Sequence, residues 1–325
     1  MKFIILALIL LSQTVFAQTL SDSDSTRISE AFHLGNEISE KIWKNWSKAP
    51  FAILLITPET EFLINHPSPS KDFTETDKTL NGKVLWRKRS FNQNLLATFP
   101  AVGGVSTIVV GQAENTASKT STPWAVTLLH EHFHQFQMSQ PNYYDEVNGL
   151  NLSNGDNSGM WMLNYQFPYK DERVKGKFEE LCKILADLIE AKKVSKEKLN
   201  EYLNARKDFQ NLLKVNDYRY FSFQSWQEGV ARYTEYQIAK SASKKYKPNA
   251  EFSALKDFST YQNVADSIFK RIIDELKTLK LDEFQRTAFY PFGAGEALLL
   301  DKVNPKWKSR YNTERFYLEK YFEKN

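Results

Sequence analysis

The feature of this sequence that most restricts its fold is a change in hydrophobic periodicity near residue 120. Before that point, short β-type runs are separated by Pro, Asn, Gly and Ser, and we predict strands over residues 51–57, 61–65, 84–86 and 105–111. After it, apolar residues recur at helical spacing, and we predict helices over residues 123–138, 174–192, 195–214, 222–240, 261–279, 294–303 and 311–323. Strands followed by helices, rather than alternating with them, predict an α+β fold with a small sheet at 50–112 and a mainly helical part at 121–325.

The first residues have the pattern of a secretory signal peptide. Lys2 precedes an apolar block, residues 3–11, and the small-residue cleavage pattern Val15-Phe16-Ala17 follows before Gln18. The block is shorter than the roughly 20 apolar residues that a membrane-spanning helix needs. We therefore predict that residues 1–17 are removed, that residues 27–46 form the first helix of the mature chain, and that the protein is exported to the periplasm or the extracellular space.

Cysteine usage and charge exclude several classes of function. The single cysteine, Cys182, lies in an apolar helical run, so neither an internal disulfide nor a cysteine zinc cluster can form. The formal net charge is only +4, and acidic and basic residues alternate, for example over residues 251–280. No nucleic-acid partner is indicated, and no later segment is apolar enough to span a membrane.

The pentapeptide His130-Glu131-His132-Phe133-His134 predicts a metal site on a helix. At about 100° per residue, His130 and His134 lie on one face, one turn apart, so both imidazoles can reach the same ion. Glu131 projects beside that face, where it can act as a general base, while His132 points to the opposite side. Three of the five histidines of the chain fall in this run, and burying them without partners would be costly.

A catalytic zinc ion usually takes three protein ligands, and no histidine follows His134. The third ligand must then be a carboxylate if it lies downstream. Glu228 is the best candidate, because Gly229 and Ala231 remove bulk beside it and would let its helix approach the histidine helix. Glu235, two turns later, is the alternative, either as the ligand itself or as a partner of one imidazole.

These residues resemble the gluzincin zinc metallopeptidases, in particular the branch of the aminopeptidases and leukotriene A4 hydrolase. The similarity rests on the HExxH motif at 130–134 and on Glu228-Gly-Val-Ala-Arg-Tyr-Thr-Glu235. It extends to Tyr290-Pro-Phe-Gly293, which is similar to the Tyr-x-x-Gly segment of that family. The resemblance implies a zincin-like catalytic domain over residues 18–325 with one Zn²⁺ ion, Glu228 as third ligand and Tyr290 as the hydroxyl that stabilises the oxyanion.

Two further features can be compared with the family pattern, one of which departs from it. His134 and Glu228 are 94 positions apart (228 − 134), more than in the aminopeptidase branch, so we predict a helical insertion at about 170–216. The segment Gly111-Gln-Ala-Glu-Asn115 faintly resembles the loop with which such aminopeptidases hold a substrate amine. Glu114 is on that basis a candidate for binding an amino terminus.

The function that follows is zinc-dependent hydrolysis of peptide bonds. Zinc would acidify a water molecule, and Glu131 would take its proton and pass it to the leaving amine. The strand at 105–110 would line the site and pair with an extended peptide or protein substrate. Two alternatives stay open: a zincin-like protein that binds zinc or a partner without catalysis, and a structural helical protein in which the motif is accidental.

Overall fold

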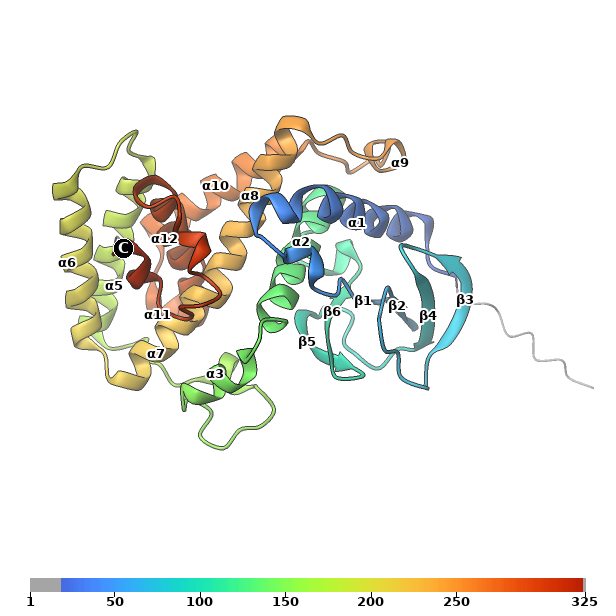
Figure 1. The fold of residues 1–325 in the computed structure, drawn as a ribbon, viewed down its shortest axis with the longest axis horizontal. Helices are drawn as coiled ribbons and strands as arrows, with labels where there is room; N and C mark the ends of the chain where they lie inside the picture. The colour runs from blue at the N-terminus through green and yellow to red at the C-terminus, as the bar shows by residue number, and fades with distance from the viewer. Residues whose placement is uncertain (1–18, 324–325) are drawn as a thin grey trace, which may run out of the picture.

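The computed structural model of the chain describes residues 19–323, and the predicted signal segment 1–17 lies outside them. Within this range a six-stranded sheet is followed by a long series of helices, so the α+β prediction is confirmed. The sheet occupies one end of the molecule, the helices α5 and α6 the other, and α2 and α8 run between the two ends (Figure 1).

The sheet contains two strands that periodicity did not predict. Its strands are β1 (Ile53–Ile56), β2 (Thr60–Ile64), β3 (Thr74–Thr79), β4 (Lys83–Lys88), β5 (Leu96–Val102) and β6 (Val105–Gly111). Their order is β3-β4-β2-β1-β6-β5, antiparallel throughout except for the parallel pair β1 and β6. The unpredicted strands, β3 and β5, are the two edges; β3 is largely exposed and β5 mostly half-buried, so neither shows a clear alternation of buried apolar residues.

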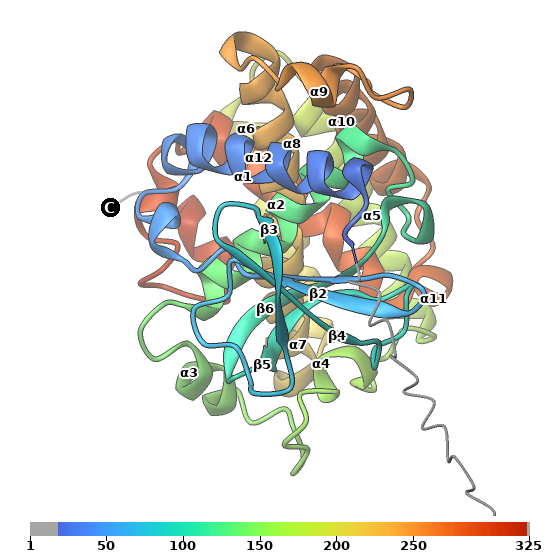
Figure 2. The ribbon, with the colours of Figure 1, turned by 90° about the vertical axis from the view of Figure 1, so that its right-hand side faces the viewer.

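The strand side chains divide between two faces. On β1, Ile53 and Leu55 join the main core, whereas Leu54 and Ile56 join a smaller apolar cluster on the other face. The main core continues into the helices, and α1 (Asp22–Ile42) and α2 (Ser121–Met138) cover that face of the sheet (Figure 2). The histidine helix α2 thus packs directly on one face of the sheet, against β5 and β6.

The helical part surrounds α2 on the side away from the sheet. After α2 it comprises α3 (Tyr143–Gly149), α4 (Trp161–Asn164), α5 (Glu172–Glu190), α6 (Lys196–Leu212), α7 (Val215–Gln224), α8 (Val230–Lys245), α9 (Ala250–Ser253), α10 (Tyr261–Thr278), α11 (Leu281–Phe284) and α12 (Phe289–Val303). The predicted helical segment 170–216 corresponds to α5 and α6, at the end of the molecule farthest from the sheet. There α5 packs against α6, α10 and α12 and buries Cys182.

One helix prediction was incomplete and another was wrong. The region 222–240 is helical throughout, as predicted, but a π-helical turn, Ser225–Gly229, lies between α7 and α8. The predicted helix at 311–323 is a series of turns with a short 3-10 segment, Leu318–Phe322. Phe316 has a φ of 73°, a left-handed conformation that the interior of an α-helix does not accommodate. In residues 19–323 none of the helices is both long and apolar enough to cross a bilayer.

Candidate metal centre

The histidine helix is fixed at its start by a residue far away in sequence. The Asp257 carboxylate accepts hydrogen bonds from the Ser121 backbone N–H at 2.9 Å and from its hydroxyl at 2.6 Å, and it pairs with Arg27 at 3.2 Å. This carboxylate supplies the cap that the preceding residue, Thr120, does not make with its own side chain. The first turn of α2 is therefore anchored to both α1 and the loop before α10.

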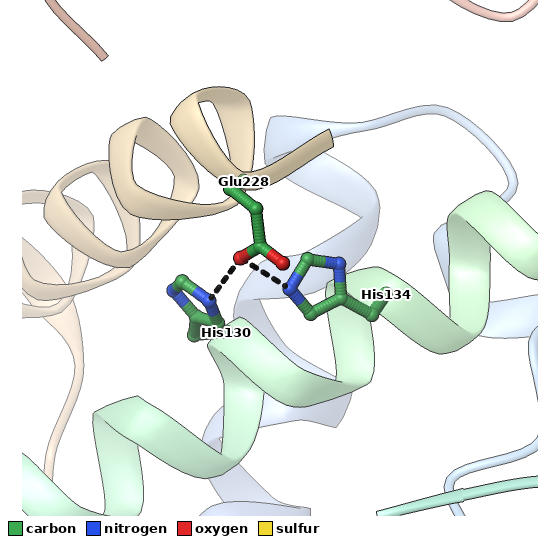
Figure 3. A group of neighbouring side chains, drawn as sticks. All are labelled: His130, His134 and Glu228. Atoms are coloured by element: carbon green, nitrogen blue, oxygen red, sulfur yellow. Dashed lines mark ion pairs between the residues drawn. The ribbon is translucent and has the colours of Figure 1, made fainter. Parts of the chain in front are cut away.

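His130 and His134 meet Glu228 across the interface between α2 and the π-helical turn (Figure 3). One carboxylate oxygen, Oε2 of Glu228, lies 3.4 Å from Nε2 of His134 and 4.0 Å from Nε2 of His130. The three side chains are 6–17% exposed, so they are largely shielded from solvent. The structure thus brings together the three residues that sequence selected as metal ligands.

The spacing and chemistry of these atoms fit a small divalent ion. Tetrahedral bonds of about 2.1 Å place ligand atoms about 3.4 Å apart. The contact between His134 and Glu228 has that length, and the three ligand atoms all lie within 4.8 Å of one another. Two imidazole nitrogens and one carboxylate oxygen form the donor set typical of hydrolytic zinc sites. These three residues could therefore hold a metal ion.

Each imidazole is held in place through its second ring nitrogen. Nδ1 of His130 lies 3.5 Å from the Glu235 carboxylate, which also pairs with Arg271 of α10 at 3.4 Å. Nδ1 of His134 lies 2.7 Å from Oε1 of Gln137. Such contacts direct both Nε2 atoms toward Glu228. Of the two roles open to Glu235, its position matches that of an imidazole partner rather than a third ligand.

Gln137 is a site residue that sequence reasoning missed. Its amide nitrogen donates to the backbone oxygen of Gln227 at 3.0 Å and to the Tyr311 hydroxyl at 2.7 Å. The side chain therefore ties His134 to the residue just before Glu228. Its position three residues after His134 on the same helix was a usable clue, because residues i and i+3 are neighbours on a helix surface.

Attraction between opposite charges dominates the electrostatics of the three residues. Burial by itself lowers the pKa of His134, but the Glu228 carboxylate outweighs this effect and holds the pKa above its ordinary value. Burial likewise raises the pKa of Glu228, but the two imidazoles, together with the charge of Arg286, reverse the shift, so this pKa lies below its ordinary value. Glu228 is consequently an ionised carboxylate, the form that binds metals.

Glu131 lies beside the three residues, as the motif geometry predicts, and contacts the edge of the sheet. The Thr98 hydroxyl of β5 lies 2.8 Å from Oε2 of Glu131 and 3.1 Å from its backbone oxygen. The carboxylate is buried, with 5% of the residue exposed. The side chain expected to act as general base is thus held by the strand that forms the open edge of the sheet.

His132 lies on the opposite face of α2, as the helical period predicts. Its ring stacks on Phe51 with 4.0 Å between centroids, and its Nδ1 is 2.9 Å from Oε1 of Gln135. Burial lowers its pKa to about 4, so the ring is neutral at physiological pH. His132 contributes to packing between the helix and the sheet and takes no part in the metal centre.

Tyr290 lies in the first turn of α12, close enough to Glu228 for the charge of that carboxylate to act on its hydroxyl. Burial, reinforced by the Glu228 carboxylate, raises the pKa of Tyr290 far above the usual range of a phenol. Its hydroxyl accepts a hydrogen bond of 2.6 Å from Nη1 of Arg286. Tyr290 is therefore protonated, and its O–H can donate to a ligand near the site.

Glu114 is not among the residues gathered around His130, His134 and Glu228. Its side chain is 58% exposed and pairs with Arg27 at 3.2 Å. Arg27 also bonds to Ser121, at the start of α2. That residue precedes His130 by nine positions (130 − 121), or about 13 Å along the helix. The structure gives no support to an amine-binding role at the metal centre.

Gly229 allows the turn that carries Glu228 to pack closely on α12, which carries Tyr290. The sequence alone predicts instead that Gly229 faces the histidine helix. A Cβ on Gly229 would lie 2.4 Å from the Cα of Gly293, and one on Gly293 would lie 2.1 Å from the backbone oxygen of Ser225. The close approach is therefore between the π-helical turn and α12, not between Glu228's helix and the histidine helix. Extra residues in π-turns are often found at functional sites, and here the turn carries Glu228.

The crossing of the two glycines leads to a stability prediction. We expect Gly229→Ala to lower the free energy of unfolding by about 1–3 kcal/mol, since the new methyl group meets backbone that cannot rotate away. Gly176→Ala in α5 is the matched control, because a Cβ there has open space and alanine favours a helix. Urea denaturation of both variants measures the difference. Equal stability of the two would show that the crossing tolerates a side chain.

The partner of His130 leads to a second prediction. We expect Glu235→Gln to weaken zinc binding by about 10- to 100-fold while activity returns at saturating zinc, because the substitution removes the charge that orients the imidazole. Glu275→Gln is the control, since Glu275 also forms an ion pair between α8 and α10, with Arg232 at 2.8 Å, but touches no histidine. Competition with a chromogenic chelator gives both affinities. An unchanged affinity in Glu235→Gln would contradict the role.

Comparison with known protein families, with curated proteins and with solved structures found no match to this chain.

Proposed function

We propose that this protein is an exported zinc metallopeptidase that hydrolyses peptide bonds with Glu131 as the general base. The observation that carries the proposal is the approach of the Glu228 carboxylate to the Nε2 atoms of both histidines, at 3.4 and 4.0 Å. Glu228 comes from a different element, 94 positions (228 − 134) after His134. An accidental HExxH motif does not require an acid in this place, whereas a three-ligand catalytic site does.

His130, His134 and Glu228 would hold the ion. Zinc bound there supplies Lewis-acid chemistry, which polarises a carbonyl group and makes water more nucleophilic at neutral pH. Gln137 and Glu235 keep the two imidazoles oriented, as their contacts with the Nδ1 atoms indicate. The Glu228 charge offsets part of the charge of the ion.

The remaining chemistry belongs to Glu131 and Tyr290. Glu131 takes a proton from the attacking water as its oxygen bonds to the carbonyl carbon, and later delivers that proton to the leaving amine when the C–N bond breaks. The Tyr290 hydroxyl, protonated and beside Glu228, donates a hydrogen bond to the oxyanion. The products are one carboxylate and one amine, which balances the addition of one water molecule.

An extended peptide is the substrate that fits the edge of the sheet. The sequence suggested the strand at 105–110 for this contact, but β6 is already paired with β1 and β5 and has no free edge. In the described part of the chain β5 pairs only with β6, so its other edge offers backbone groups to a peptide. Because Thr98 of β5 contacts Glu131, a peptide added there would run next to the general base.

Zinc analysis combined with digestion of a peptide library tests the proposal. We expect close to one zinc ion per chain and cleavage products that mass spectrometry identifies. A stoichiometric ion without cleavage under any condition would favour the alternative, a zincin-like protein that binds zinc or a partner. The absence of a stoichiometric ion would favour a structural helical protein.

A further inference from the structure

Arg286 is a partly buried arginine that forms no ion pair with a carboxylate within residues 19–323, and Arg219 is another. Arginines that are largely buried elsewhere in residues 19–323 form ion pairs with acids, among them Arg27, Arg87, Arg206, Arg232 and Arg315. The Arg286 guanidinium makes a single hydrogen bond within this range, to the hydroxyl of Tyr290. A guanidinium has five N–H donors in a planar fork that matches a carboxylate, so most of this capacity is unused.

The surroundings of Arg286 contain little negative charge of their own. The ionisable groups around Arg286 include Tyr290, Tyr220, Tyr169 and Glu228, and of these only Glu228 is a carboxylate. The only acid among them, Glu228, already faces His130 and His134. A positive charge that is half-buried and short of a counter-ion favours an incoming anion.

Arg286 also lies close to the turn that carries Glu228. Its Nη1 is 2.6 Å from the hydroxyl of Tyr290, which lies in the first turn of α12, and α12 packs on the π-helical turn where Gly293 meets Gly229. The guanidinium is therefore a neighbour of Glu228, and its charge acts on that carboxylate. Because consecutive Cα atoms are about 3.8 Å apart, a residue close to the scissile bond of a bound peptide would be the one to meet such a group.

We propose that Arg286 binds a carboxylate of the peptide substrate next to the scissile bond and so sets specificity. This inference rests on the proposed peptidase function and narrows its substrate class to peptides with an acidic group at the cleavage point. Two sources supply that group, the free C-terminus of the peptide and an Asp or Glu side chain. A pair of N–H···O bonds from the planar fork would hold either one.

Three matched peptides of one sequence test the proposal: one with a free C-terminus, one amidated, and one amidated with an internal Glu beside the scissile bond. We expect wild-type protein to cleave at least one acidic peptide with a kcat/KM about tenfold or more above the neutral one, mainly through KM. In Arg286→Met this preference should disappear. Arg219→Met is the control, because Arg219 also lacks a carboxylate partner but bonds to the Leu150 backbone and Asn216, and it should keep the preference.

Tyr290→Phe separates substrate binding from mere support of the tyrosine. If Arg286 only positions Tyr290, both Arg286→Met and Tyr290→Phe should slow acidic and neutral peptides equally, and that result would overturn the proposal. Arg286→Lys keeps the charge without the planar fork and should retain part of the preference. Calorimetry gives a readout without turnover: zinc-loaded Glu131→Gln should bind the acidic peptide about tenfold more tightly than the neutral one, and adding Arg286→Met should abolish the difference.

The outcomes separate this inference from the peptidase function. Equal cleavage of all three peptides by the wild type, with zinc bound, contradicts the role of Arg286 and leaves the function intact. Failure to cleave any peptide contradicts the function. In that case the calorimetric comparison still decides whether Arg286 binds a carboxylate.

Discussion

The Glu131→Gln variant is expected to lose hydrolytic activity by about 100- to 10,000-fold while it retains its metal ion. The amide has nearly the shape of the carboxylate but cannot accept a proton, so the step that activates water loses its base. Thr98 can still contact the side-chain oxygen, and therefore the local packing should persist. Measurement requires kcat with a cleaved peptide and the zinc content of the same preparation.

The control for this variant is Glu114→Gln. Glu114 is an acid on the surface that pairs with Arg27 and is not grouped with the metal ligands. We expect its replacement to leave both activity and zinc content unchanged. Unchanged hydrolysis in Glu131→Gln would refute the assignment of the base, and loss of zinc in that variant would mean that Glu131 is a ligand instead.

The Glu228→Gln variant should weaken zinc binding by more than about 100-fold. Loss of a group that only orients a ligand costs about 10- to 100-fold in affinity, and removal of a direct, charged ligand should cost more. In the protein without its ion, the substitution also removes the attraction that raises the pKa of His134. Zinc affinity from chelator competition and zinc content after dialysis measure the effect.

Glu251→Gln serves as the control, because Glu251 is an exposed acid in the short helix α9. We expect this variant to bind zinc as the wild type does. A Glu228→Gln protein with wild-type zinc affinity would exclude Glu228 as the third ligand and return Glu235 to consideration. The two acids are thus distinguished by the size of the loss, which should be greater at Glu228.

Much of the metal centre could be predicted because helical geometry decides it locally. A 3.6-residue period places His130 and His134 on one face and His132 on the other, whatever the rest of the fold is. Glu228 was chosen because a third ligand was required and because small residues lie beside it, although Gly229 in fact faces Gly293 of α12. The placement of the histidines depends on neighbours in sequence, which is why it agrees with the prediction, whereas the approach of Glu228 depends on tertiary packing.

The parts that could not be predicted depend on contacts between distant segments. Gly229 was correctly singled out as permitting a close approach, but its partner, Gly293, is fixed only when α12 packs on the π-helical turn. The turn itself has no distinguishing composition in Ser225–Gly229. The unpaired guanidinium of Arg286 likewise becomes visible only once the carboxylates of the whole chain have been placed.

The edge strand β5 shows a different limit. Its residues, Leu96–Val102, are mostly half-buried and include a proline, so they lack the alternating pattern by which a strand is recognised. Proline is tolerated there because an edge strand leaves one row of backbone groups unpaired. The strand that contacts Glu131 was for this reason overlooked, and the substrate contact was assigned to its neighbour β6.

A crystal structure of the zinc-loaded protein with anomalous diffraction at the zinc edge would show whether His130, His134 and Glu228 bind the ion together. We expect one anomalous peak about 2.0–2.2 Å from Nε2 of His130, Nε2 of His134 and a carboxylate oxygen of Glu228. A peak elsewhere, or a peak at the histidines with Glu228 turned away and no other acid in its place, would contradict the account.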